Sequence, residues 1–246
     1  MPEVLLTSDS AGVRTLTFNR PEALNAFNQQ LWHALGDALL AAAADDGIGC
    51  VLLTGAGRAF SAGQDLVEMA DPSVFEDREP GYEHFMPILE TFPKPLLAAV
   101  NGVGVGIGLT ILLHCDMVLI ASDARLKVPF MSLGVTTEAA ASLLLPATTG
   151  RQRASEIIYT EPWIDAETAV ADGLALRSVE PALLMREADT LATSVAAQPL
   201  RSLVATKKLL NATRLAAVRE ARVRESAAFA DLVSAMTVAG THEGPT

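Results

Sequence analysis

The stretch NGVGVGIGL, residues 101–109, carries glycine at alternate positions inside LLAAVNGVGVGIGLTILL, a run of eighteen residues without a charge. A run of that length can cross a bilayer as a helix. Repeated glycine opposes this interpretation, because each glycine in a helix costs about 1 kcal/mol relative to alanine. The preceding FPKP and Asn101 are typical of a strand that ends in a turn. The stretch therefore predicts a buried strand, a turn and the start of a helix.

Two familiar glycine motifs do not fit this stretch. The dinucleotide-binding fingerprint needs glycine at its first, third and sixth positions, and here the sixth falls on Ile107 or Leu109. A phosphate-binding loop of the Walker type lacks its lysine. Glycine also lets a flat substrate touch the backbone, or a helix pack closely on a strand, and both uses remain open at this point.

Composition narrows the class of protein. A chain of 246 residues suits one large domain or one domain with an appendage, and 50% hydrophobic residues predict a packed core. The net charge of −11 argues against nucleic acid or an anionic membrane as a partner. The start, MPEVLLTSDSAG, has no basic region followed by an apolar block, so a cytoplasmic protein is expected. Cys50 and Cys115 lack metal-ligand spacing and are predicted to be buried free thiols.

Hydrophobic periodicity predicts an α/β chain in which the order strand, strand, helix recurs through the first two thirds. No sequence repeat is clear enough to prove a spiral. Residues 70–82 are polar and contain proline, which predicts a mobile loop. Nearly everything from Leu183 onward is predicted to be helical. Strands are predicted within 13–21, 49–57, 94–102, 117–128 and 175–180, and helices within 28–45, 84–92, 106–116, 137–150, 151–160 and 165–174.

Two strand-to-helix junctions could carry chemistry. They are GRAFSAGQDL, residues 57–66, and AAVNGVGVGIG, residues 98–108. Backbone N–H groups at a helix start have no partner inside the helix and carry partial positive charge. Two such helix starts that face each other would supply two donors to one developing oxyanion. Close packing of helix on strand would explain the same glycines, so spacing alone leaves both interpretations open.

Four sequence segments occur together in a characteristic order. They are NRPEALNAFN, GRAFSAGQDL, KPLLAAVNGVGVGIGLTILLHCDMVLIASDARL and PFMSLGVTTEAAASLLLP. In order and spacing they resemble the crotonase family of enoyl-CoA hydratases and isomerases, over roughly residues 4–212. The resemblance implies a crotonase-like spiral of ββα turns with a helical C-terminal region. Residues 1–195 would form the spiral core with the acyl-CoA site, and residues 196–246 a helical oligomerisation region.

The same resemblance implies the binding partners. The substrate would be an acyl-CoA thioester, and coenzyme A would enter as part of it, so no separate cofactor or metal is expected. Family members assemble as trimers or pairs of trimers, which predicts a homotrimer or homohexamer. Lys207 and Lys208 are candidates for contact with the coenzyme A phosphates, although a solvated helix face explains them equally well.

Site residues follow from the matching positions. The resemblance implies that the backbone N–H groups of Gln64 and Ile107 form the oxyanion hole. Ile107 stands where the family often has glycine, and its side chain could narrow the pocket. The remaining residues are those that the resemblance places along the coenzyme A groove and the acyl pocket: Ala23, Leu24, Ala26, Ala62, Gly63, Asp65, Leu66, Gly106, Phe130 and Leu133.

The carboxylates distinguish between reactions. Hydratases of the family use two glutamates, and the corresponding positions here hold Thr110 and Phe130, neither of which can act as a carboxylate base. Glu138, eight residues past Phe130, resembles the single acid of an isomerase branch with the pattern PF..LG...E; related ring-opening CoA isomerases carry aspartate there. Glu138 is expected at a helix start, where the helix would lower its pKa and burial would raise it. An ordinary acidic residue in a first helical turn is the alternative.

A lone carboxylate suits a reaction that needs no activated water. It can take a proton from one carbon of an enoyl thioester and return it to another, which indicates a Δ3,Δ2-enoyl-CoA isomerase with Glu138 as acid and base. Three alternatives stay open: an enoyl-CoA hydratase, another enolate reaction such as ring-expanding isomerisation of an aromatic-derived CoA ester, and an acyl-CoA-binding protein without turnover.

Overall fold

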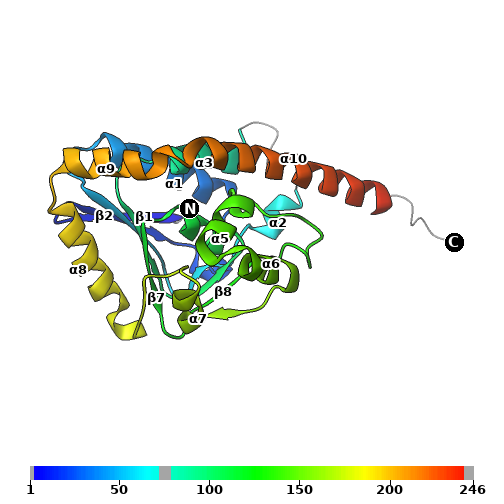
Figure 1. Ribbon diagram of the computed structural model, residues 1–246, viewed down its shortest axis with the longest axis horizontal. Coiled ribbons are helices and arrows are strands. Elements are labelled where there is room, and N and C mark those ends of the chain that lie inside the picture. The colour runs from blue at the N-terminus through cyan, green and yellow to red at the C-terminus, as the bar shows by residue number, and fades with distance from the viewer. Residues whose placement is uncertain (1–2, 72–78, 241–246) are drawn as a thin grey trace.

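The computed structural model describes residues 3–71 and 79–240, which form two β-sheets surrounded by helices (Figure 1). The larger sheet has six strands in the order β1-β2-β3-β5-β7-β10. The first two strands form an antiparallel pair, and the others join in parallel. Its strands are β1 (Leu5–Ser10), β2 (Val13–Phe18), β3 (Cys50–Gly55), β5 (Leu96–Val100), β7 (Met117–Ala121) and β10 (Arg177–Val179).

The smaller sheet has four short strands in the order β4-β6-β8-β9. Its strands are β4 (Ala59–Ser61), β6 (Val103–Val105), β8 (Arg125–Lys127) and β9 (Ile164–Asp165). After each of β3, β5 and β7 the chain passes directly to the next strand of the smaller sheet and then into helix. This repeated strand–strand–helix turn confirms the predicted α/β spiral.

Helices cover the sheets and form a layer along one side of the molecule (Figure 1). Within the first half of the chain they are η1 (Pro21–Ala23), α1 (Gln29–Ala44), α2 (Leu66–Met69), α3 (Gly81–Thr91), α4 (Ile107–Thr110) and the 3₁₀ turn η3 (Ile111–His114). Later ones are α5 (Ala141–Thr149), α6 (Arg151–Thr160), α7 (Ala166–Ala171), η4 (Pro181–Leu183), α8 (Leu184–Ala196), α9 (Leu200–Ala212) and α10 (Leu215–Gly240). The end of α10 extends beyond the rest of the fold (Figure 1).

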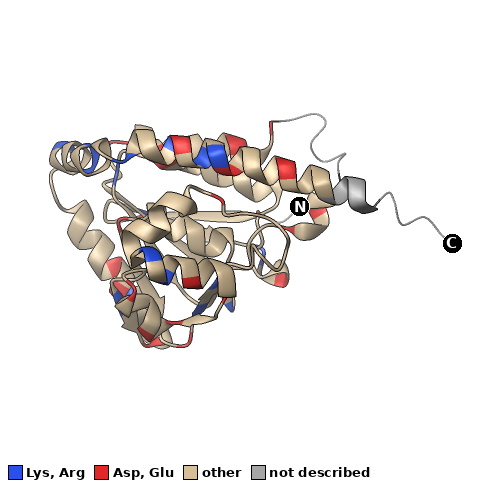
Figure 2. Cartoon of the chain, turned by 45° about the vertical axis from the view of Figure 1, so that its right-hand side comes forward, with Lys and Arg blue, Asp and Glu red and all other residues tan. Residues whose placement is uncertain are grey.

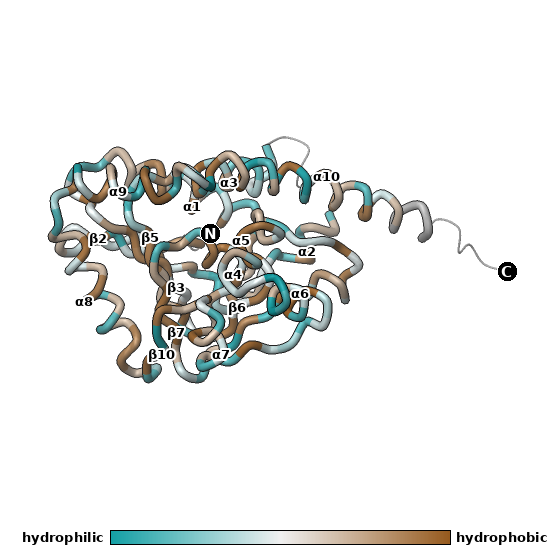
Figure 3. Tube along the Cα trace, viewed as in Figure 1, coloured by the Kyte–Doolittle hydropathy of each residue, from teal (hydrophilic) through white to brown (hydrophobic). Residues whose placement is uncertain are grey.

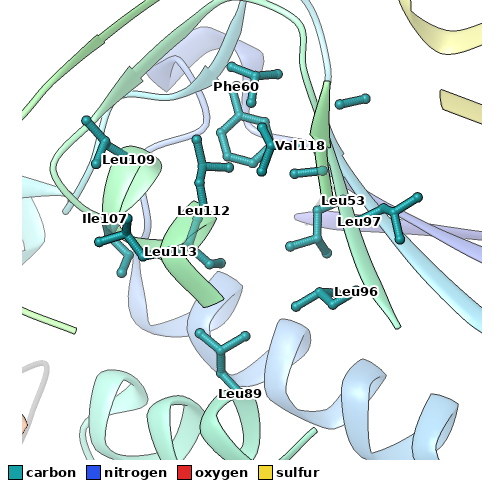
Figure 4. Packing of buried hydrophobic residues seen from close by; sticks show 14 of the residues in the cluster. Leu53, Phe60, Leu89, Leu96, Leu97, Ile107, Leu109, Leu112, Leu113 and Val118 are labelled. Atoms are coloured by element: carbon teal, nitrogen blue, oxygen red, sulfur yellow. The ribbon is translucent and has the colours of Figure 1, made fainter. Parts of the chain in front are cut away.

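The core lies between the two sheets and their helices. Every residue of β3 and β5 is buried, as expected of parallel strands that are covered on both faces. Apolar residues concentrate in these central strands (Figure 3). In close view, side chains from α4 and η3 pack toward those of the central strands, with Phe60 between them and Val118 (Figure 4). This packing fixes the position of the glycine-rich stretch relative to the sheets.

The uncharged run at 96–113 is divided among β5, β6, α4 and η3. In the described part of the chain, no helix has both the length and the apolar content that a membrane crossing requires. One predicted detail was wrong, since β6 lies in a segment predicted as turn, and β4 lies in a segment for which no strand was predicted. Three-residue strands are too short to show a period in the sequence. The segment 70–82, predicted as a mobile loop, falls mostly outside the described residues.

Candidate active site

The first strand-to-helix junction places Gln64 in the loop between β4 and α2, directly before Asp65, the N-cap of α2. Phe27 donates its N–H to the carbonyl of Gly63 at 2.7 Å and accepts the N–H of Asp65 at 3.0 Å. This bridge uses the residues on both sides of Gln64, so the Gln64 N–H points away from Phe27. The Gln64 side chain is held by Trp32, whose indole Nε1–H donates to its Oε1 at 3.0 Å. The N–H of Gln64 is therefore left free to donate a hydrogen bond, and the hydrogen bonds of Phe27 and Trp32 hold the loop that carries it.

The second junction places Ile107 at the first position of α4. Gly106 precedes it with φ 53° and ψ −119°, a conformation that favours glycine, and its N–H donates to the carbonyl of Lys127 at 2.9 Å. As the first helical residue, Ile107 has no acceptor for its own N–H inside α4. Its side chain is fully buried among core residues (Figure 4), and whether it narrows an acyl pocket stays a prediction.

The two junctions touch each other at their glycines. A Cβ built on Gly106 would lie 3.9 Å from the Cα of Gly63, and one built on Gly63 would lie 2.9 Å from the carbonyl oxygen of Val105. The two candidate donors, Gln64 and Ile107, directly follow these glycines. Among the hydrogen bonds of the described residues, none uses either N–H. Two free amides, one in the loop before α2 and one at the start of α4, can bind one oxyanion.

Glu138 faces this pair of junctions. Its Oε1 lies 3.7 Å from the position that a Cβ on Gly106 would occupy. Its expected place in a first helical turn was wrong: α5 begins only at Ala141, after Ala139 and Ala140, whose φ angles of 56° and 60° are left-handed. Removal from water is the main cause that raises the pKa of Glu138 to about 7, and the charge of Glu225 adds to it. Such a pKa suits a group that must both take and return a proton near neutrality.

Two buried side chains fix the backbone next to Glu138. The hydroxyl of Tyr82 accepts the N–H of Ala139 at 2.9 Å, and Nε2 of His114 lies 2.8 Å from the carbonyl oxygen of Ala139. Burial lowers the pKa of His114 to about 4, so the neutral ring donates this hydrogen bond. His114 and Tyr82 thus both hold the backbone beside Glu138, and nothing in the sequence indicated the contact made by Tyr82.

The residues predicted to line a coenzyme A groove come from two segments that lie side by side. The N–H of Ala62 donates to the carbonyl of Leu24 at 2.9 Å, and the bridge at Phe27 continues the pairing. Arg20 links the segments through its ion pair with Asp65 at 2.9 Å. Asp65 also accepts the first N–H groups of α2. The structure therefore brings together Ala23, Leu24, Ala26, Ala62, Gly63, Asp65 and Leu66, while their contact with a ligand stays a prediction.

Two further predicted lining residues, Phe130 and Leu133, belong to the turn before Glu138. Phe130 is buried, Leu133 is exposed, and the carbonyl of Phe130 accepts the N–H of Val135 at 2.9 Å. Thr110 is fully buried in α4, and its Oγ1 has no hydrogen-bond partner among the described residues. Neither position that holds glutamate in hydratases carries a titratable group here.

Other candidate residues are engaged elsewhere. Nζ of Lys207 lies 2.7 Å from Asp116 Oδ2 and 2.8 Å from the carbonyl oxygen of Lys94 in a buried site, so it is not placed to meet a phosphate. Lys208 is exposed. Cys50 and Cys115 are free thiols whose pKa values are raised by burial. No group of three or more His, Cys, Asp or Glu side chains within 3–71 and 79–240 is placed to hold a metal ion.

A groove of about 280 Å³ also exists between α1 and α3. Its lining is apolar apart from Thr91, and it contains no titratable side chain. The groove therefore offers no acid, base or nucleophile, and the convergence of Glu138 with the two glycine junctions is the better candidate for chemistry.

Comparison with known proteins identifies the family of this chain. Residues 8–245 match the family described as enoyl-CoA hydratase/isomerase. The 1,2-epoxyphenylacetyl-CoA isomerase of Escherichia coli K12 is 37% identical over 217 residues, covering 86% of this chain and 83% of that protein. An enoyl-CoA hydratase/isomerase from Pseudoalteromonas atlantica T6c superposes with a TM-score of 0.91 at 37% identity, covering 94% and 91% of the two chains. An enoyl-CoA hydratase from Mycobacterium marinum superposes with a TM-score of 0.80 at 49% identity, covering 85% and 99%.

Proposed function

The chain belongs to the enoyl-CoA hydratase/isomerase family, and on that premise we propose that it moves the double bond of an acyl-CoA thioester from C3 to C2, with Glu138 as acid and base. One observation carries this proposal: the carboxyl of Glu138 faces Gly106, beside the unpaired N–H groups of Gln64 and Ile107. A proton acceptor and two oxyanion donors thus meet at one point of the fold.

The proposed reaction needs only these groups. The thioester oxygen accepts hydrogen bonds from the N–H of Gln64 and of Ile107. The ionised carboxylate of Glu138 removes a proton from C2 of the 3-enoyl thioester, and the electron pair spreads over the dienolate to the thioester oxygen. The protonated carboxyl then returns the proton to C4, which leaves the double bond between C2 and C3. Each well-placed oxyanion donor contributes about 3–4 kcal/mol in reactions of this kind.

The surroundings of Glu138 favour isomerisation over hydration. The positions of the two hydratase glutamates hold buried Thr110 and Phe130. The carboxylate of Glu225, which lies nearby, already accepts three hydrogen bonds from the chain. The described residues around Glu138 therefore supply no second free carboxylate that could activate a water molecule.

A second candidate reaction is the isomerisation of a strained aromatic-derived CoA ester. The Escherichia coli relative named 1,2-epoxyphenylacetyl-CoA isomerase is 37% identical to this chain and supports it. Such a reaction would use the same oxyanion donors. The hydratase name of the Mycobacterium marinum structure keeps water addition as a third candidate.

A substrate panel separates these candidates. The panel contains 3-hexenoyl-CoA, crotonyl-CoA and the epoxide of phenylacetyl-CoA, each incubated with wild type, Glu138→Gln and Glu138→Ala. We expect wild type to convert 3-hexenoyl-CoA into the 2-enoyl isomer, measured by chromatography and mass spectrometry. Both variants should lose at least a hundredfold in kcat, or about 3 kcal/mol in the barrier. Glu167→Gln, an exposed glutamate on α7, serves as the matched control.

Other products would decide against the proposal. Hydration of crotonyl-CoA that Glu138→Gln leaves unchanged would identify a hydratase. Consumption of the epoxide alone would identify the second candidate. Tight binding of every ester without any product, in wild type and variants alike, would identify an acyl-CoA-binding protein.

We also propose a trimer or a pair of trimers, assembled through the C-terminal region 196–246. Exposed apolar side chains on α9 and α10 support this: Leu209, Leu210 and Val223 are 73%, 68% and 61% exposed. Light scattering should give about three or six times the 25.9 kDa of one chain, and a monomer would contradict the proposal. A cytoplasmic location stays a prediction from the sequence.

A further inference from the structure

The backbone that carries Glu138 has an unusual conformation. Ala139 and Ala140 both adopt left-handed φ angles, 56° and 60°, which are strained for an L-residue with a Cβ. α5 then begins at Ala141, and its N-cap, Ala140, has no side chain that could accept the first helical N–H groups. Another part of the chain must therefore hold this segment in place.

Glu225 of α10 supplies the missing acceptors. Its Oε2 accepts the N–H of Ala140 at 2.7 Å, and its Oε1 accepts the N–H of Ser142 at 2.7 Å and the hydroxyl of Thr137 at 3.1 Å. The donors are 83 to 88 positions away in sequence, and Glu225 is 5% exposed. A buried carboxylate thus caps α5 from a distant helix, in the way that an N-cap side chain does locally.

Arg222, about one helical turn before Glu225, fixes the position of α10. Arg222 donates from Nε to Glu90 at 2.7 Å and from Nη1 to Glu83 at 3.3 Å, and both glutamates belong to α3. α10 packs against α3 and α5, and acidic and basic residues follow one another along it (Figure 2). The carboxylate of Glu225 therefore reaches the Glu138 segment from a helix whose position is fixed against α3 by Arg222.

We propose that Glu225 is a positioning residue that holds the segment 137–142, and with it the carboxyl of Glu138, against Gly106. The catalytic part of this inference rests on the proposed function. The hydrogen bonds between Glu225 and the segment 137–142 do not depend on it. The groups that face Glu138 are Glu225 from α10 and Tyr82 from α3, with Arg222 close to Tyr82 and His114 on Ala139. The negative charge of Glu225 raises the pKa of Glu138, so Glu225 acts on both the place and the protonation of the acid/base.

The test compares Glu225→Gln with Glu220→Gln, an exposed glutamate on the same helix whose ion pair with Arg224 is loose, at 3.6 Å. With 3-hexenoyl-CoA, Glu225→Gln should lose at least tenfold in kcat with KM changed less than threefold. The midpoint of its kcat–pH profile should fall below that of wild type. Glu220→Gln should behave as wild type. Wild-type kcat and an unmoved midpoint in Glu225→Gln would overturn the proposal.

Two measurements test the role of Glu225 even if the protein converts no CoA ester. Hydrogen exchange of the Ala140 and Ser142 amides should accelerate at least tenfold in Glu225→Gln, and NMR titration of the Glu138 carboxyl should show a lowered pKa. If wild type converts no ester, the proposed function fails while these two readouts still decide the role of Glu225; unchanged exchange and titration would refute it. Should Glu225→Gln not fold, Thr137→Val removes one of the three donors but keeps the charge of Glu225, so a smaller loss of kcat and a smaller acceleration of exchange are expected without a lowered pKa of Glu138.

Discussion

Glu138 and Gly106 face each other so closely that a Cβ on the glycine would meet Oε1 of the glutamate at 3.7 Å. The two residues come from different turns of the spiral, one before α5 and one before α4. Their contact places a carboxyl with a raised pKa beside the N–H of Ile107. The absence of a side chain at position 106 therefore leaves room for the reacting part of a substrate.

Substitution of Gly106 should damage catalysis beyond its effect on stability. Gly106→Ala places a Cβ on a φ of 53° and into the space beside Glu138. Gly150→Ala is the matched control, because its φ is 79° and a Cβ there meets nothing within 4 Å. Both variants should lose about 1–3 kcal/mol of unfolding free energy from backbone strain. Only Gly106→Ala should also lose about a hundredfold in kcat, measured on folded protein with 3-hexenoyl-CoA.

The reaction should depend on the ionisation of Glu138. Because the proposed first step needs the carboxylate, kcat should rise with pH through about 7 and then level off. Steady-state rates between pH 5 and 9 measure this profile, with unfolding checked at each pH. A rate that stays flat across this range would contradict the role of Glu138 as the base.

The raised pKa of Glu138 should also make the free energy of unfolding depend on pH. The carboxyl titrates near 4.5 when unfolded and near 7 when folded, so between these pH values the folded chain holds a proton that the unfolded chain has lost. The free energy of unfolding contributed by this group therefore falls as pH rises from about 4.5 to about 7. Glu138→Gln removes this dependence and should gain up to about 3 kcal/mol relative to wild type between pH 4.5 and pH 8. Urea unfolding at both pH values measures it, and an equal gain in Glu167→Gln would rule out this cause.

The order of strands and helices followed largely from local pattern, whereas the candidate site residues came from the resemblance to the family. Glycines at 63 and 106 end strands and precede helix starts, a relationship that spacing alone indicates. Glu138 was found because the family pattern places an acid at that point, but its helical position was predicted incorrectly. Two left-handed alanines delay α5, and no propensity rule predicts left-handed alanine.

The partners of Glu138 could not be found from sequence. Glu225 lies in a tail of alternating charges, where each glutamate resembles a solvated residue, and only tertiary packing separates it from exposed Glu220. Tyr82 lies next to a polar segment, and nothing in the sequence indicated that its hydroxyl would bind the backbone beside Glu138. Lys207 looked like Lys208 in sequence, yet the structure buries the first and exposes the second. Long-range contacts of this kind have no local signature.

The adjacent lysines of α9 provide the last prediction. Lys207 is buried and pairs with the partly exposed carboxylate of Asp116, which also accepts the N–H of Leu96 at 2.7 Å, whereas Lys208 is exposed. Lys207→Met removes this pair and the hydrogen bond to the carbonyl of Lys94, and should lower the free energy of unfolding by about 1–3 kcal/mol. Lys208→Met should change it by less than about 0.5 kcal/mol. Urea unfolding measures both effects. KM for a CoA ester, determined where each variant is folded, should stay within threefold for Lys207→Met; a tenfold rise would mean that Lys207 binds the coenzyme A phosphates after all.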